Sequence, residues 1–119
     1  MTTEPALVLA EPSGVIRAWN PGAEALFGHA AADAIGRTLD LIVPPEYRER
    51  HWAGIRAAMA AGNGNIDHSS FNIPALHRDG TVIRVAVRLL VVQDSRNRVA
   101  GAMAVFSPDD DSAPPLPRL

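Results

Sequence analysis

The sequence predicts an α+β domain in which five antiparallel strands form one sheet, with short helices and one longer helix on one face. The first observation is the order of segments: two short apolar runs, several short helical segments, one longer helical segment and three extended segments. The second is that apolar residues alternate with a period of two over residues 81–93, as in a half-buried strand. The third is that they recur every three or four residues over 46–61, as in a helix. A sheet with helices packed on one side is the architecture that this order favours.

The first two strands are predicted to form a hairpin. Residues 6–10 and 15–19 are apolar runs, and four turn-forming residues separate them. A helix over residues 21–27 follows. Asn20 is suited to cap the free backbone N–H groups of that helix. Pro21 has no backbone N–H, but at the first helical position this group would have no partner within the helix.

The middle of the chain is predicted to be helical. Residues 30–35 and 38–43 predict two short helices, and Pro44-Pro45 ends the second. A longer helix is predicted over residues 46–61. One face of it carries Tyr47, His51, Ile55, Ala58 and Met59.

Three extended segments are predicted after residues 62–65, where glycine and asparagine break the helix. They cover residues 66–76, 81–93 and 99–106. Asp79-Gly80 is a strong hairpin signal between the first two. Residues 108–119 contain three consecutive Asp and four Pro. We therefore expect one domain over residues 1–107 and a disordered Pro/Asp-rich tail over 108–119.

The composition excludes several classes of function. The net charge is −2, from 13 acidic and 11 basic residues, and every basic residue is Arg. The arginines are scattered among acids, so no basic face suited to nucleic acid is expected. The chain contains no Cys, which excludes disulfides, thiolate nucleophiles, Cys-ligated zinc and cysteine–flavin photochemistry.

The remaining motifs favour neither catalysis nor a membrane. No apolar segment approaches the length of a membrane span, and no basic stretch followed by an apolar run opens the chain, so a cytoplasmic location is expected. No nucleophile elbow, phosphate-binding loop or zinc-binding histidine motif is present, so the chain is not expected to be an enzyme. His29 and His77 lie next to turns and are expected to face solvent.

Three segments carry a resemblance to a known family. They are GVIRAWNPGAEALFG at 14–28, IGR at 35–37 and RDGT at 78–81. In this order and spacing they resemble the PAS family of sensor domains over residues 5–107. The resemblance implies a sheet curled around a small cavity, which PAS domains use for haem, flavin or metabolites, or fill with packed side chains. It also implies that conformational change passes to a partner through the sheet or its flanks.

A narrower resemblance concerns residues 45–51, PEYRERH. This segment is similar to the helix that carries the proximal histidine in the oxygen-sensing haem PAS domains of rhizobial nitrogen-fixation kinases. It implies haem b with His51 as the iron ligand, and a neutral imidazole is a good axial ligand for haem iron. The cofactor-binding residues expected on this basis are His51, Trp52, Ile55, Arg56, Met59, Ile66, His68, Phe71, Val87 and Leu89.

Two positions depart from that pattern. The distal arginine that binds oxygen in the haem subgroup is replaced by Phe71, and the arginine that pairs with a haem propionate falls at Ala57, next to Arg56. Distal polarity would then come from Asn72 or His68. An apolar distal wall favours carbon monoxide or nitric oxide over oxygen.

Two functions stay open at this point. The first is a haem-based sensor of a diatomic gas or of redox state. The second is a cofactor-free PAS interaction module that supports homodimerisation or docking, with the apolar run at residues 6–10 as a dimer edge. No kinase, cyclase or DNA-binding segment follows residue 106, so either the output is expected to reside in a partner such as a histidine kinase, or this sequence is a fragment of a longer protein.

Overall fold

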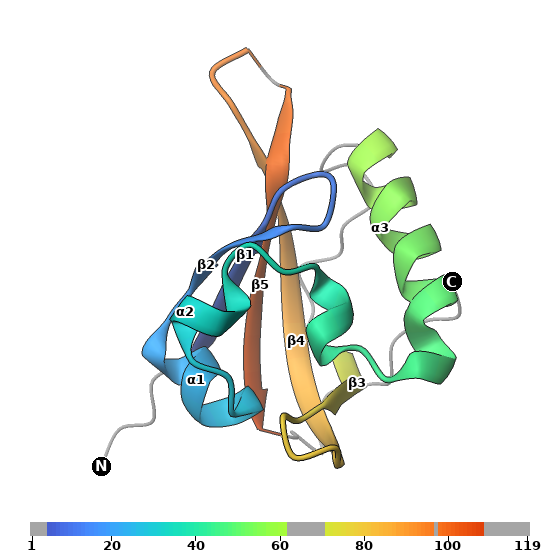
Figure 1. Cartoon of the computed structure of the whole chain (residues 1–119). Coiled ribbons are helices and arrows are strands. Elements are labelled where there is room, and N and C mark those ends of the chain that lie inside the picture. The colour runs from blue at the N-terminus through green and yellow to red at the C-terminus, as the bar shows by residue number, and fades with distance from the viewer. Residues whose placement is uncertain (1–4, 62–70, 97, 109–119) are drawn as a thin grey trace.

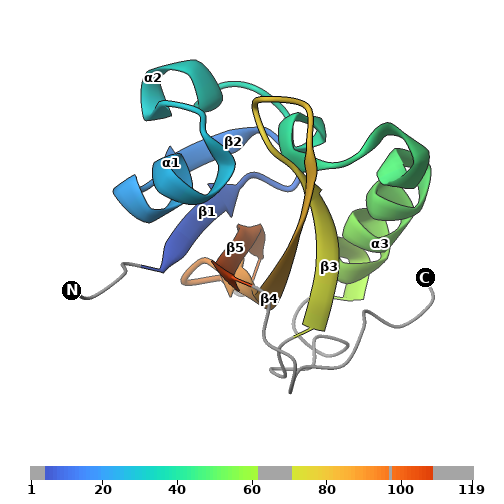
Figure 2. The ribbon, with the colours of Figure 1, turned by 90° about the horizontal axis from the view of Figure 1, so that it is seen from below.

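The computed structural model describes residues 5–61, 71–96 and 98–108 (Figure 1). The elements are β1 Ala6–Ala10, β2 Ile16–Trp19, α1 Pro21–Phe27, α2 Ala31–Ala34, η1 Leu39–Ile42, η2 Pro45–Tyr47, α3 Arg48–Ala61, β3 Phe71–Leu76, β4 Val82–Gln93 and β5 Val99–Pro108, where η marks a 3₁₀ helix. Figure 2 shows the helices on one side of the sheet. The predicted α+β class is confirmed.

The five strands form one antiparallel sheet in the order β2-β1-β5-β4-β3. The first and last strands of the chain therefore meet inside the sheet, with Val8 opposite Ala104. The interpretation of residues 6–10 as a dimer edge is wrong. The backbone of β1 is already hydrogen-bonded to β2 on one side and to β5 on the other, so the edges of the sheet are β2 and β3.

Asn20 begins α1 as predicted and also fastens this helix to β1. Its side-chain Oδ1 accepts hydrogen bonds from Ala23 N, at 2.9 Å, and from Leu7 N, at 2.8 Å. Its Nδ2 donates to the carbonyl oxygen of Pro5 at 2.8 Å. One side chain thus caps a helix and supplies backbone partners to the strand beside it.

The connecting segment is more tightly wound than expected. Residues predicted as a helix over 38–43 form the 3₁₀ turn η1, and the predicted helix over 46–61 begins with η2 before α3. The Arg48 side chain stabilises this arrangement by donating to the carbonyl oxygens of Val43, at 3.2 Å, and Asp40, at 3.3 Å. It gives the carbonyl of Val43, the C-cap of η1, a partner, and it adds a second donor to the carbonyl of Asp40, which also accepts from Val43 N.

Aromatic side chains from three elements form the centre of the core. Phe27 of α1 lies with its ring centroid 5.5 Å from Trp19 of β2 and 5.0 Å from Phe106 of β5. Val8 and Val85 are buried with them. The core therefore joins the start of the chain to its last described strand.

The C-terminal strands differ from prediction at their ends. Of the extended segment predicted at 66–76, residues 71–76 form β3, and residues 66–70 lie outside the described residues. Strand β5 continues to Pro108, which pairs with Val85 and so belongs to the sheet rather than to the predicted tail. Residues 109–119 lie outside the described ranges. None of the helices in the described ranges is long and apolar enough to cross a membrane.

Candidate ligand-binding site

His51 lies in the first turn of α3 and is half-buried. Its Nδ1 atom is buried and has no hydrogen-bond partner among the residues that the structure describes. Buried polar atoms nearly always have a hydrogen-bond partner. The unpaired Nδ1 of His51 therefore marks a position where a bound group could supply one. The ring packs edge-on against Trp52, with the centroids 5.8 Å apart.

The surroundings of His51 favour a neutral imidazole. Burial lowers the pKa of His51 below its ordinary value of 6.5, and the negative charge of Asp40 opposes this shift only in part. A neutral imidazole keeps a lone pair that can coordinate a metal ion. Among the described residues, no group of three or more His, Asp or Glu side chains is placed to hold a metal ion.

Trp52 fixes the start of α3 to the N-terminal half of the domain. Its Nε1 donates to Oδ1 of Asp40, a residue of η1, at 2.8 Å. Its ring lies over Gly14, which has φ of +88°, so that a Cβ atom at Gly14 would come within 2.2 Å of the ring. Glycine is required there both for its left-handed backbone and for the space that the indole occupies.

The remaining predicted cofactor residues fall into three groups. Val87 is 2% exposed and Leu89 is partly buried, and both pack with the core. Arg56 is exposed on α3. Ile55 and Met59 belong to α3 and Phe71 to β3, where Phe71 pairs with Val87. Ile66 and His68 lie outside the described residues.

The interpretation of Asn72 as a distal polar group is wrong. Asn72 pairs with Ala86, whereas Val87 pairs with Phe71. Neighbouring residues of a strand point to opposite faces of the sheet. Asn72 is therefore on the face opposite to Val87, away from the helices.

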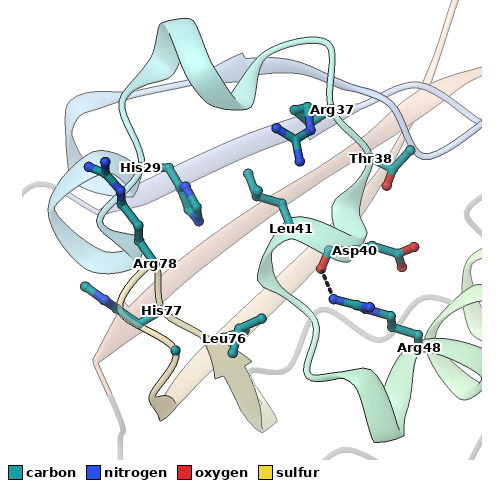
Figure 3. Close-up of a pocket in the computed structure, with 10 residues that line it drawn as sticks. His29, Arg37, Thr38, Asp40, Leu41, Arg48, Leu76, His77 and Arg78 are labelled. Atoms are coloured by element: carbon teal, nitrogen blue, oxygen red, sulfur yellow. Dashed lines mark hydrogen bonds between the residues drawn. The ribbon is translucent and has the colours of Figure 1, made fainter.

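A separate cavity of about 340 Å³, which we call the arginine cavity, is formed by segments that are distant in the sequence (Figure 3). It is lined by His29, Arg37, Thr38, Asp40, Leu41, Arg48, Leu76, His77, Arg78 and Gly80. Arg78 N donates to the carbonyl oxygen of Phe27 at 2.9 Å, which holds the β3–β4 turn against the end of α1.

The expectation that His29 and His77 face solvent is wrong. Both are half-buried and line the arginine cavity. The ring of His77 lies over Gly28, where a Cβ atom would come within 2.7 Å of it. This contact joins residues about fifty positions apart, and no local pattern in the sequence indicates it.

Comparison with known proteins places these features in a family. The family model described as PAS fold matches residues 2–108. An uncharacterised protein of Azorhizobium caulinodans is 34% identical over 107 residues, which are 89% of this chain and 14% of that protein. The chain thus spans about a seventh of that relative's length.

Two solved structures share the fold. The PAS domain of a protein from Colwellia psychrerythraea superimposes with a TM-score of 0.77 at 23% identity, over 88% of this chain and 86% of that one. A light-oxygen-voltage domain studied with a flavin analogue superimposes with a TM-score of 0.72 at 17% identity, over 91% and 79%. The order of the strands, the helix-covered face and the match over residues 2–108 lead to one conclusion: the chain belongs to the PAS fold family.

Proposed function

We propose that this PAS signal-sensing domain binds haem b through His51 and responds to a diatomic gas or to redox state. The observation that carries the proposal is the buried, unpartnered Nδ1 of a ring that burial keeps neutral. Val87 and Leu89 would provide the apolar wall, and Arg56, exposed on the same helix as His51, is available to a propionate. When bound, haem supplies an iron centre that takes up a gas or an electron.

The contacts of Trp52, the residue after His51, could carry a signal from His51 to the rest of the domain. Trp52 is bonded to Asp40 and packs over Gly14, so a displacement of His51 along α3 also pulls on η1 and on the β1–β2 turn. Packed elements of this kind move as units rather than deforming smoothly. We therefore expect occupancy at His51 to be transmitted toward the N-terminal edge of the sheet, where a partner can detect it.

The experiment is reconstitution of the full chain with haemin. We expect a strong Soret band that shifts on exposure to carbon monoxide and is lost in His51→Ala. His29→Ala is the matched control, since it removes a different half-buried histidine, and it should retain the band. Absence of the band, or an unchanged band in His51→Ala, would rule out this proposal.

A second candidate is a cofactor-free interaction module that forms a homodimer or docks on an output protein such as a histidine kinase. The helix-free face of the sheet favours it. Leu9, Met103 and Leu90 lie in one row across β1, β5 and β4. Leu90 is 38% exposed and Val92, two residues along, is 37% exposed. An apolar surface of this kind is typical of an interface. In neither candidate does the chain act as an enzyme.

Dimerisation through this face can be tested without any cofactor. Light scattering after gel filtration should give a dimer mass for the native chain and a monomer mass for Leu90→Glu. Ile35→Glu is the control, because it adds the same charge at an exposed apolar position outside the sheet. A dimer that survives Leu90→Glu would place the interface elsewhere.

A further inference from the structure

The arginine cavity concentrates positive charge that the rest of the protein does not share. The chain has more acidic than basic residues, 13 against 11, yet this cavity is lined by three arginines, two histidines and a single carboxylate, Asp40. That carboxylate already accepts a hydrogen bond from Trp52. Such an excess of like charge around a hollow favours an anion inside it.

The three arginines have different tasks. Arg48 is engaged with the carbonyl oxygens of Val43 and Asp40, so its position is structural. For Arg37 and Arg78, no ion pair with a carboxylate is formed within the described parts of the chain. Their guanidinium groups therefore retain the planar donor sets that suit a carboxylate or a phosphate.

His29 lies in the field of both arginines. Figure 3 shows its ring between Arg37 and Arg78. Burial lowers the pKa of His29 most, and the positive charges of Arg78, His77 and Arg37 lower it further. The negative charge of Asp33 opposes this shift, with the smallest effect of these groups. An anionic group beside His29 would therefore be attracted by the arginines.

Two apolar side chains also line the cavity. Leu41 of η1 and Leu76 of β3 contribute half-buried side chains to the lining. The volume of about 340 Å³ lies at the lower end of the range for small-molecule sites. A ligand suited to this mixed lining is small, with an anionic group and a short hydrocarbon body.

We propose that the arginine cavity binds a small organic carboxylate, with Arg37 and Arg78 holding its anionic group and Leu41 and Leu76 contacting its carbon chain. The site is separate from His51, which does not line the cavity. It is connected to the same helix, because Arg48 begins α3 and also lines the cavity. Occupancy would give the sensor a second chemical input.

The test is a titration of the ¹⁵N-labelled full chain with succinate at low ionic strength, followed by amide chemical shifts. We expect saturable shifts at His29, in residues 37–41 and in residues 76–80. Succinamide, which has the same carbon chain without the charge, should cause none. Arg37→Gln and Arg78→Gln should each weaken succinate binding about tenfold, the effect of losing one charge-assisted contact.

The controls separate this site from general charge effects and from haem binding. Arg88→Gln removes an exposed arginine from β4 and should leave the affinity unchanged. His51→Ala should also leave it unchanged, so failure of the haem proposal and failure of this one are distinguishable. Equal weakening by Arg88→Gln, the absence of saturable shifts, or saturation by inorganic phosphate but not by succinate would each overturn the proposal. Because Arg37 and Arg78 are exposed, both variants should keep the native spectrum outside the cavity.

Discussion

At the scale of single residues, His51 and Trp52 show how adjacent side chains acquire different roles. Trp52 is held by a hydrogen bond to Asp40 and by the space above Gly14. His51, one position earlier, has a buried nitrogen with no partner. That His51 lies in a helix could be predicted from the spacing of apolar residues. The missing partner could not, because it depends on which groups from other segments come near.

The buried His51 should make stability depend on pH. Since burial lowers its pKa in the folded state, the unfolded chain binds a proton below pH 6.5 that the folded chain does not. Stability should therefore be fully present above pH 6.5 and decrease as the pH falls through the window between the two pKa values. Urea unfolding at a series of pH values measures this, and His51→Gln should reduce the slope.

His29 should contribute the pH dependence of stability that remains when His51 is replaced. Its pKa is also lowered by burial, so a smaller pH dependence of the same sign should persist in His51→Gln. An unchanged slope in His51→Gln would show that His51 does not lose solvation on folding.

Gly14 provides a second prediction at this scale. Gly14→Ala introduces a methyl group where the Trp52 ring lies and where φ is +88°, so the free energy of unfolding should fall by about 1–3 kcal/mol. Thermal unfolding measures the change. Gly36→Ala is the matched control, because its φ is +93° but nothing lies within 4 Å, so it reports the backbone cost alone. Equal losses in the two variants would contradict the contact with Trp52.

At the scale of elements, the start of α1 was predictable from the sequence. The hydrogen bonds that join this helix to β1 were not. The Asn20-Pro21 pair indicates a cap from local rules alone. The bonds of Asn20 to Leu7 and Pro5 involve residues thirteen and fifteen positions away, and only the adjacent course of β1 produces them.

Substitution of Asn20 should separate these two roles. Asn20→Ala removes the cap and both bonds to β1, and we expect a loss of about 2–3 kcal/mol in the free energy of unfolding. Asn20→Asp keeps the acceptor for Ala23 and Leu7 but loses the donor to Pro5, so its loss should be smaller, about 1 kcal/mol. Urea unfolding of the three proteins measures both. Equal losses would mean that the Pro5 contact alone stabilises this junction.

At the scale of the whole molecule, the core depends on contacts between the two ends of the chain. Phe106 of β5 is 5% exposed and packs edge-on against Phe27 of α1. Phe106→Ala should cost about 3–5 kcal/mol, a large part of the roughly 5–15 kcal/mol that stabilises a domain. Calorimetry should show a strongly lowered Tm. Val82→Ala, at an exposed position of β4, is the control and should change stability by less than about 0.5 kcal/mol.

The sequence by itself determined the types of most elements, the cap of α1 and the family resemblance, because these depend on interactions within a few residues. Periodicity placed β4 correctly, and the prolines after residue 43 ended η1 as expected. The tertiary structure alone decided that β1 lies between β2 and β5, which moved residues 6–10 from an expected edge to the interior of the sheet. It also decided that Asn72 lies on the face opposite to Val87, and that His29 and His77 line one cavity with Arg37 and Arg78. Contacts between distant residues are not indicated by the sequence pattern of either segment. They exist only because burial of a common core holds the segments together.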